Sequence, residues 1–143
     1  MLTTRRTVLI EWGDCDPAGI VYFPRYVAWF DNSTHELFRR AGYEKYEMQR
    51  KFGMLGIPIV DVRAKFYIPS RYGEFVDIES TVAEFGRSSF RVVHRMLKGE
   101  ALAAEGFETR VWVVVDPKDP TKIKGAPIPR ELTERFEQGG QGG

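Results

Sequence analysis

The chain has 143 residues, 43% of them hydrophobic, which suits one domain with its own core rather than two domains. Its 21 basic and 20 acidic residues leave a formal net charge of +1, so no overall positive field recruits nucleic acid. A single cysteine excludes an internal disulfide framework and a cysteine-rich zinc site, and no apolar run approaches the roughly 20 residues that cross a membrane. We expect one cytoplasmic domain over residues 1–137 and a disordered glycine-rich tail at 138–143.

The N-terminal part of the chain predicts a strand, a turn and the start of a helix. Residues 7–10 are apolar or β-branched and favour a strand. Turn formers follow at Gly13, Asp14 and Gly19, and Pro24 suits the first turn of a helix. This order places acidic side chains shortly before a helix N-terminus.

From residue 24 to about 41, apolar residues recur with the 3.6-residue period of an amphipathic helix. The predicted buried face consists of Tyr26, Val27, Phe30, Ser33, Thr34, Leu37, Phe38 and Ala41. His35 and Glu36 point the other way, and Gly42 is suited to end the helix. This segment is the longest helix that the sequence predicts.

Strand patterns dominate the rest of the chain. Apolar or alternating runs recur at 57–67, 74–85, 89–97 and 101–115, with short helices expected at 46–51 and about 129–137 and a turn at 116–120. Short turn-like separators between the last three strands favour antiparallel hairpins. A sheet and one long apolar helix bury each other, so we expect an α+β domain with an antiparallel five-stranded sheet wrapped around that helix.

The segment between the first strand and the long helix also suits acyl-transfer chemistry. Unpaired N–H groups at a helix N-terminus stabilise an oxyanion, and a nearby carboxylate such as Asp16 attacks a carbonyl or deprotonates water. From the residues alone, however, an aspartate before proline is also a common turn residue.

This segment resembles a known family. The motif Gly-Asp-Cys-Asp-Pro-Ala-Gly-Ile-Val at residues 13–21, followed by an aromatic pair and Tyr26, resembles the 4-hydroxybenzoyl-CoA thioesterase family of hotdog-fold enzymes. The resemblance implies that Asp16 is catalytic and that the backbone amide of Phe23 polarises the thioester carbonyl. Many members carry a histidine where this chain has Phe23, so a mechanism that needs this histidine is excluded.

Substrate-binding residues are also implied by the resemblance. Tyr22, in the aromatic pair, is expected to contact the substrate. Arg87, Ser88 and Ser89 offer a guanidinium and two hydroxyls for the phosphates of coenzyme A, although a solvated hairpin is an equal reading of this turn. Members of the family build their sites between subunits, so the resemblance implies a homodimer or homotetramer.

Other candidate residues have simpler interpretations. Asp14 reads as a turn acid, Cys15 as a packing residue and His94 as a hydrogen-bonded histidine under the sheet. His35 reads as a surface or subunit-contact residue rather than a catalytic one. Within the helix, Asp31 and Glu36 are reserve carboxylates that rank below Asp16. A calcium loop starting at Asp14 fails because Ala18 and Arg25 occupy positions that need oxygen ligands, so no metal is expected.

The sequence therefore predicts an acyl-CoA thioesterase. Asp16 acts as nucleophile or general base, and the helix N-terminus at Phe23 holds the oxyanion. The acyl group is expected to be aromatic, as in 4-hydroxybenzoyl-CoA, or short. No cofactor is expected, since coenzyme A is part of the substrate. The alternative is a non-catalytic acyl-CoA binding module of the same fold.

Overall fold

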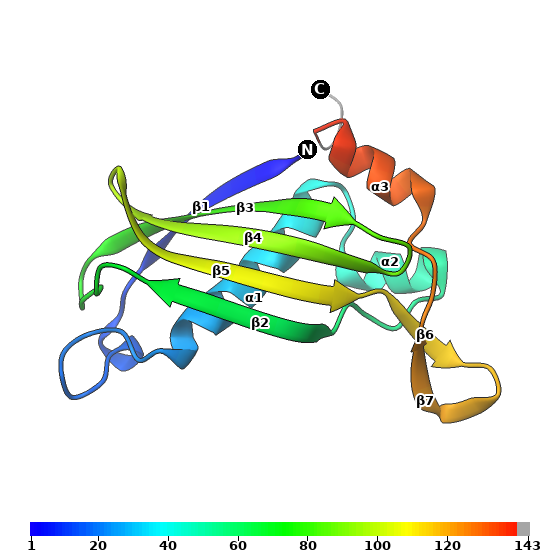
Figure 1. Cartoon of the computed structure of the whole chain (residues 1–143), viewed down its shortest axis with the longest axis horizontal. Coiled ribbons are helices and arrows are strands. Elements are labelled where there is room, and N and C mark those ends of the chain that lie inside the picture. Colours follow the sequence, from blue (N-terminus) through cyan, green and yellow to red (C-terminus); the bar gives the residue numbers. More distant parts are fainter. Residues whose placement is uncertain (140–143) are drawn as a thin grey trace.

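The computed structural model of the protein describes residues 1–139. Five strands form one antiparallel sheet in the order β1-β3-β4-β5-β2 (Figure 1). The strands are β1 (Thr3–Leu9), β2 (Ile59–Phe66), β3 (Phe75–Phe85), β4 (Ser89–Lys98) and β5 (Ala101–Val111). The predicted α+β class with a five-stranded antiparallel sheet is confirmed, while most of the expected tail at 138–143 lies outside the described residues.

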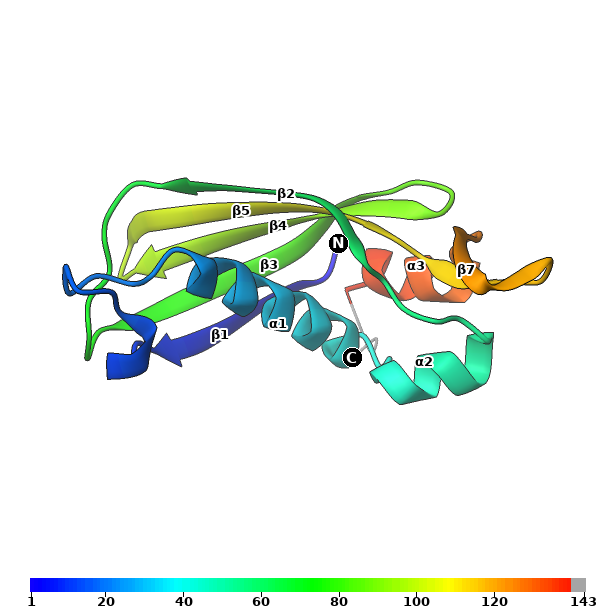
Figure 2. The same ribbon diagram turned by 90° about the horizontal axis from the view of Figure 1, so that it is seen from below.

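Helix α1 (Pro24–Arg40) packs on one face of the sheet, against β1, β3 and β4 (Figure 2). Most positions of its predicted inner face are buried, and Trp29 is buried as well, although the periodicity did not assign it to that face. Val27 is only partly covered. Three shorter elements complete the helical part: η1, a 3-10 turn (Trp12–Asp14), α2 (Lys45–Phe52) and α3 (Arg130–Glu137).

The core divides into two clusters along α1. At its N-terminal half, Tyr26 and Phe30 pack with Ile10, Ile78 and Met96 from the first turn and the sheet. At its C-terminal half, α1 contributes to a cluster that also draws on the end of the sheet, α2 and α3. The largest fully buried side chains of this second cluster are Phe38, Phe90, Trp112 and Phe136.

The expected single strand over residues 101–115 is wrong. The chain leaves the sheet after β5 at Trp112 and forms a separate two-stranded sheet from β6 (Val113–Asp116) and β7 (Asp119–Gly125). Trp112 is the cause, because its ring is buried in the core, its N–H donates to the Ser88 carbonyl at 2.7 Å and its carbonyl accepts from the Ala126 N–H at 2.9 Å. Strand β7 was not predicted.

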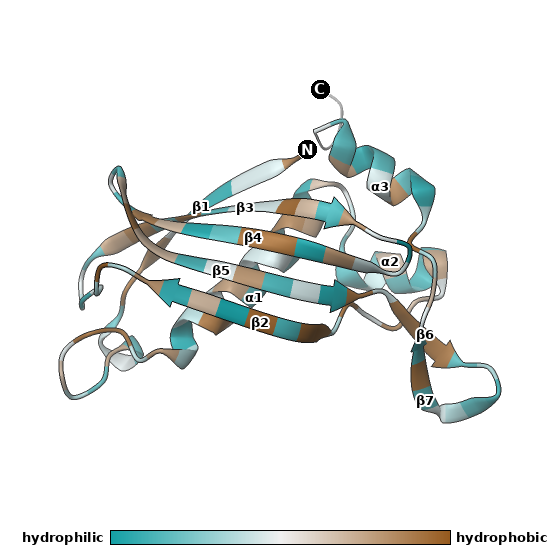
Figure 3. Ribbon diagram, viewed as in Figure 1, coloured by the Kyte–Doolittle hydropathy of each residue, from teal (hydrophilic) through white to brown (hydrophobic). Residues whose placement is uncertain are grey.

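Hydropathy alternates along β3, β4 and β5, as expected for strands with one face on a core and the other toward solvent (Figure 3). Along β4, for example, Phe90, Val92, His94 and Met96 are buried, while Arg91 and Arg95 between them are exposed. Residues 1–139 contain no helix that is both long and apolar enough to traverse a bilayer.

Candidate active site

Residues 14–22 form a small hairpin between η1 and α1. Cys15 pairs with Val21 in an antiparallel bridge, the Asp16 N–H donates to the Ile20 carbonyl at 2.9 Å, and the Tyr22 N–H donates to the Asp14 carbonyl at 2.8 Å. The turn closes because the Ala18 N–H donates to Asp16 Oδ1 at 2.8 Å. This is an Asx turn, and it fixes the Asp16 carboxylate at the tip of the hairpin.

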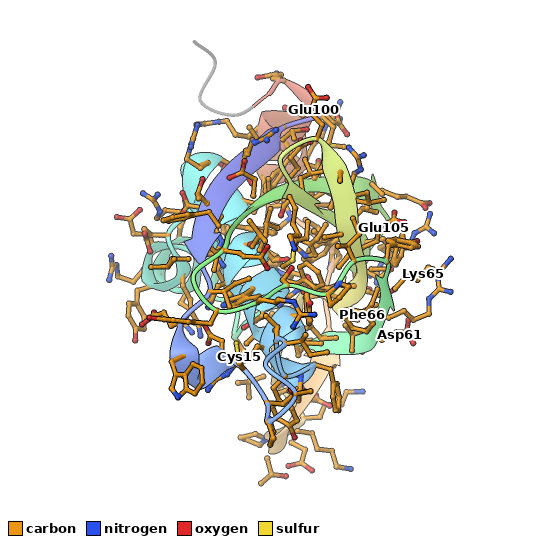
Figure 4. All side chains as sticks on the ribbon, turned by 90° about the vertical axis from the view of Figure 1, so that its left-hand side faces the viewer. Cys15, Asp61, Lys65, Phe66, Glu100 and Glu105 are labelled. Carbon is orange, nitrogen blue, oxygen red and sulfur yellow. The ribbon has the colours of Figure 1, made fainter. Side chains whose placement is uncertain are left out.

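Alternation along this hairpin separates core residues from candidate site residues. Val21 is buried and Cys15 packs on the same cluster, so the predicted packing role of Cys15 is confirmed. Asp16 and Tyr22, each one position further along, face outward, and Tyr22 is half exposed. Figure 4 views this end of the molecule, with Cys15 labelled in the N-terminal loop.

Asp14 serves the local backbone. Its Oδ2 accepts from the Glu11 N–H at 2.8 Å, and its Oδ1 lies 3.6 Å from Nε of Arg25. The predicted turn role of Asp14 is therefore confirmed. Asp16 uses Oδ1 in its own turn, and the hydrogen bonds within residues 1–139 include none to its Oδ2.

Phe23 is the N-cap of α1, directly before Pro24. Its φ of −53° and ψ of −34° are helical, a conformation that is disfavoured before proline. In the described part of the chain no group accepts a hydrogen bond from the Phe23 N–H. The Phe23 side chain is 65% exposed and its ring centroid lies 5.4 Å from that of Tyr22. A donor without a partner thus lies at the positive end of a helix dipole.

The other predicted binding residues, Arg87, Ser88 and Ser89, lie at the opposite end of the sheet. They form the β3–β4 turn, beside α3 and the β6–β7 hairpin (Figure 1). The Arg87 carbonyl accepts from the Ile128 N–H at 2.8 Å, which ties this turn to the C-terminal segment. Strand β3, with 11 residues and a length of about 35 Å, separates the turn from the Asp16 hairpin. One chain therefore does not bring the two sets of residues together.

A cleft of about 720 Å³ extends along the outer side of α1 from Pro24 to His35. Its walls are mainly apolar, and its polar groups include Asp31, His35 and Arg110. Met54, Leu55 and Ile57 line it, whereas Trp29 packs in the core. The lining of the cleft begins at Pro24, one residue after Phe23.

Polar contacts anchor one wall of this cleft. Arg110 donates to Asp31 Oδ1 at 2.6 Å, and His35 Nε2 lies 3.5 Å from the same oxygen. Burial lowers the pKa of His35, and the Asp31 carboxylate opposes this shift. Glu36 instead pairs with Arg39 on the helix surface, and this contact lowers its pKa.

Three buried polar residues, His94, Glu108 and Arg110, lie behind this wall of the cleft. His94 is fully buried and bonds to Ser80 and Thr34, so the predicted role of His94 under the sheet is confirmed. Glu108 and Arg110 were not among the predicted site residues. The sequence does contain a signal for them. They are two positions apart in a strand, so both lie on the strand face that also carries Ala104 and Gly106.

Comparison with known proteins identifies the class. Residues 10–136 match the thioesterase-like superfamily, and the chain belongs to that superfamily. Over 131 residues it is 31% identical to the 4-hydroxybenzoyl-CoA thioesterase of Pseudomonas sp. strain CBS-3, which covers 87% of this chain and 91% of that protein. The resemblance read from the motif at residues 13–21 is thereby confirmed.

Solved structures agree with this assignment. An Asp-to-Asn mutant of 4-hydroxybenzoyl-CoA thioesterase in complex with 4-hydroxybenzoyl-CoA has a TM-score of 0.87 and 27% identity, covering 95% of this chain and 99% of that one. A gentisyl-coenzyme A thioesterase matches with a TM-score of 0.78 and 28% identity. The match covers 94% of this chain and 99% of that one.

Proposed function

We propose that this thioester hydrolase cleaves aromatic acyl-CoA thioesters to the free acid and coenzyme A, with Asp16 and the Phe23 amide as its catalytic groups. The observation that supports this most directly is that a carboxylate fixed at a hairpin tip is followed, seven residues later, by an unpartnered N–H at the start of α1. In this proposal α1 is the single long helix around which the sheet wraps. The reaction needs no cofactor, because coenzyme A belongs to the substrate.

In the proposed mechanism the thioester carbonyl oxygen accepts a hydrogen bond from the Phe23 amide, where the helix dipole stabilises the developing oxyanion. Asp16 either attacks the carbonyl carbon, so that loss of the thiolate leaves a mixed anhydride that water then hydrolyses to the free acid, or removes a proton from a water that attacks the same carbon. The C–S bond then breaks and coenzyme A leaves as a thiolate. Since a thiolate is a good leaving group, a carboxylate is sufficient to drive the step.

The aromatic acyl group is supported by the relatives and by the cleft. The relatives at 31% and 28% identity are named for 4-hydroxybenzoyl and gentisyl thioesters, both of which carry a phenol. In this chain the cleft along α1 has apolar walls for a ring. Asp31 lies on the cleft wall, where its carboxylate is able to accept a hydrogen bond from a phenol hydroxyl.

The proposed active unit contains two copies of the chain, as a homodimer or within a homotetramer. Asp16, Tyr22 and Phe23 lie at one end of the sheet and Arg87, Ser88 and Ser89 at the other. A second copy in antiparallel orientation would bring its Arg87–Ser89 turn to the Asp16 end of the first. That turn would then contact the phosphates of coenzyme A.

Replacing Asp16 by Asn tests the assignment. Asparagine retains the Asx turn but removes the nucleophile or base, so we expect turnover of 4-hydroxybenzoyl-CoA to fall by a factor of at least about 100 while ligand binding persists. Release of thiol is followed with a colorimetric reagent over benzoyl, hydroxybenzoyl, short-chain and long-chain thioesters.

Asp14→Asn is the matched control, since Asp14 supports only the local backbone and Arg25. We expect this variant to retain most activity. An Asp16→Asn enzyme that turns over normally would refute the role of Asp16. Binding of acyl-CoA by the wild-type chain without release of thiol would select the non-catalytic binding module instead.

A further inference from the structure

Strand β5 carries an ion pair on its inner face, under α1, where apolar or small residues are expected. Glu108 is 1% exposed and Arg110 is 2% exposed. The two residues are separated by one position, so their side chains share the face that also carries Ala104 and Gly106. Burying two charges costs several kcal/mol per ion unless hydrogen bonds compensate for the lost water. A buried ion pair in this position therefore indicates a role other than packing the core.

Glu108 is held by residues from two other elements, α1 and β4, and from its own strand. Its Oε1 accepts from Thr34 Oγ1 at 2.5 Å and from Arg110 Nε at 2.9 Å, and it lies 3.3 Å from His94 Nε2. Ser80 Oγ lies 2.6 Å from His94 Nδ1 and fixes the ring from the far side. Burial would raise the pKa of Glu108, but His94 and Arg110 outweigh burial and lower it to about 2. The carboxylate is ionised at neutral pH.

Arg110 connects this buried group to the cleft. Its three nitrogens donate to three different acceptors: Nε to Glu108, Nη1 to the Ile57 carbonyl at 3.0 Å, and Nη2 to Asp31 Oδ1 at 2.6 Å. The rigid fork of the guanidinium therefore has one permitted orientation. Asp31 is 43% exposed, and the hydrogen bonds within residues 1–139 leave its Oδ2 unused.

We propose that Glu108 and Arg110 are positioning residues that fix Asp31 as a hydrogen-bond acceptor on the cleft wall, so that the enzyme selects acyl groups carrying a hydroxyl donor. Thr34 and His94 hold Glu108 in place for this purpose. The inference rests on the proposed function, because it assigns the selectivity of the same cleft. Without Arg110 a half-exposed aspartate has several rotamers, and each hydrogen bond to a hydroxyl then costs side-chain entropy.

Selectivity distinguishes this role from a purely structural one. The readout is the ratio of kcat/KM for 4-hydroxybenzoyl-CoA to kcat/KM for benzoyl-CoA, two substrates that differ in one hydroxyl. We expect Arg110→Met and Arg110→Lys to lower this ratio by about tenfold, since lysine keeps the charge but loses the fork. Glu108→Gln is expected to lower the ratio too, although Glu108 does not line the cleft. Arg95→Met, at an exposed position on β4, is the control and leaves the ratio unchanged.

A structural ion pair would affect both substrates equally. If Glu108→Gln and Arg110→Lys lower the melting temperature but leave the ratio at its wild-type value, the proposal is overturned. Should those variants fail to fold, Thr34→Val removes one bond to Glu108 while keeping the shape of the side chain, and the same loss of selectivity is expected.

A binding measurement separates this proposal from the proposed function. Thioether analogues with 4-hydroxyphenacyl and phenacyl groups on coenzyme A cannot be hydrolysed, and calorimetry gives the affinity ratio of the pair for each variant. A wild-type chain that cleaves neither thioester would refute the proposed function. Even then, the binding data would test the positioning role. If the ratio of affinities for the 4-hydroxyphenacyl and phenacyl analogues is higher in the wild-type chain than in Arg110→Lys, the role is supported. If the two ratios are equal, the role is refuted.

Discussion

In the proposed mechanism Phe23 contributes through its backbone amide. Its side chain is largely exposed and carries no hydrogen-bonding or acid–base group. What the position offers is an N–H at the first turn of α1, held in a helical conformation despite the following proline. Residue identity alone could not reveal this, because every residue other than proline has the same amide.

The amide of Phe23 is testable by substitution with proline. Phe23→Pro removes the N–H, and the native φ of −53° already lies within the range of proline. We expect kcat to fall by about 100-fold to 1,000-fold, the usual loss for one oxyanion donor, with little change in the affinity of an unreactive analogue.

Phe23→Ala is the matched control, since it deletes the exposed ring and keeps the amide. This variant should retain kcat within a few-fold of wild type, as expected for a surface substitution. If the alanine variant loses as much turnover as the proline variant, the aromatic side chain rather than the amide is the active feature.

At the scale of elements, α1 is seated on β5 through one close contact. Phe30 stacks on His94 with a centroid separation of 5.0 Å, and its ring lies directly over Gly106. A Cβ at position 106 would overlap that ring, so only glycine permits this approach. The contact sets the depth of α1 above the sheet and thereby places Asp31 and Thr34 over Glu108 and Arg110.

Gly106→Ala should therefore destabilise the protein by about 1–3 kcal/mol through overpacking. Urea unfolding at a fixed protein concentration measures the change. Gly56→Ala is the control, since a Cβ there meets nothing within 4 Å, and its stability should differ from wild type by less than about 1 kcal/mol. Equal stabilities for the two variants would contradict the proposed seating of α1.

Glu108 gives strand β5 a distinctive pH dependence. Its pKa is about 2 in the folded protein against an ordinary value of 4.5 for glutamate, so folding stabilises the ionised form. That stabilisation is fully present above about pH 4.5 and is lost as the pH falls toward about 2. Glu108→Gln lacks the contribution at every pH and leaves Arg110 with Asp31 as its remaining carboxylate partner.

We therefore expect Glu108→Gln to be about 3–5 kcal/mol less stable than wild type at neutral pH, with the difference shrinking below about pH 4.5. Urea midpoints measured at several pH values between 7 and 3 give this profile. For Glu84→Gln, at an exposed pair with Arg91, only a small difference is expected at neutral pH. A difference for Glu108→Gln that stays constant down to pH 3 would contradict the assignment.

Much of the element order was predictable because period and turn residues are local signals. The long helix, the three successive hairpin strands and the turn at 116–120 follow from them. The exit from the sheet at Trp112 did not, because residues 111–115 form an unbroken apolar run and the bend depends on a distant contact with Ser88. The cleft and the contacts of the Glu108–Arg110 pair were not predicted from the sequence for the same reason, because both depend on which elements meet in space.

The whole molecule leaves part of its sheet uncovered. Helix α1 packs mainly on β1, β3 and β4 and reaches β5 at Gly106. On β2, at the edge, Phe66 contacts Tyr26 of α1, yet Val62 and Phe66 on the helix side remain 39% and 52% exposed. Figure 4 shows Lys65 at the outer side of this strand. A long edge strand with exposed apolar residues favours pairing with another chain. The same flank contains the cleft, so a second copy seated here would close it.

Subunit complementation tests whether the site is shared between copies. Asp16→Asn impairs the catalytic end and Arg87→Ala the proposed phosphate-binding end, and each homodimer should have low activity on its own. After unfolding and refolding an equal mixture, half of the dimers are mixed, and each mixed dimer has one site with both native halves. We expect recovery of about one quarter of wild-type activity. If Asp16 and Arg87 served the same site from one chain, every site in the mixture would remain defective, and activity would stay at the average of the two variants.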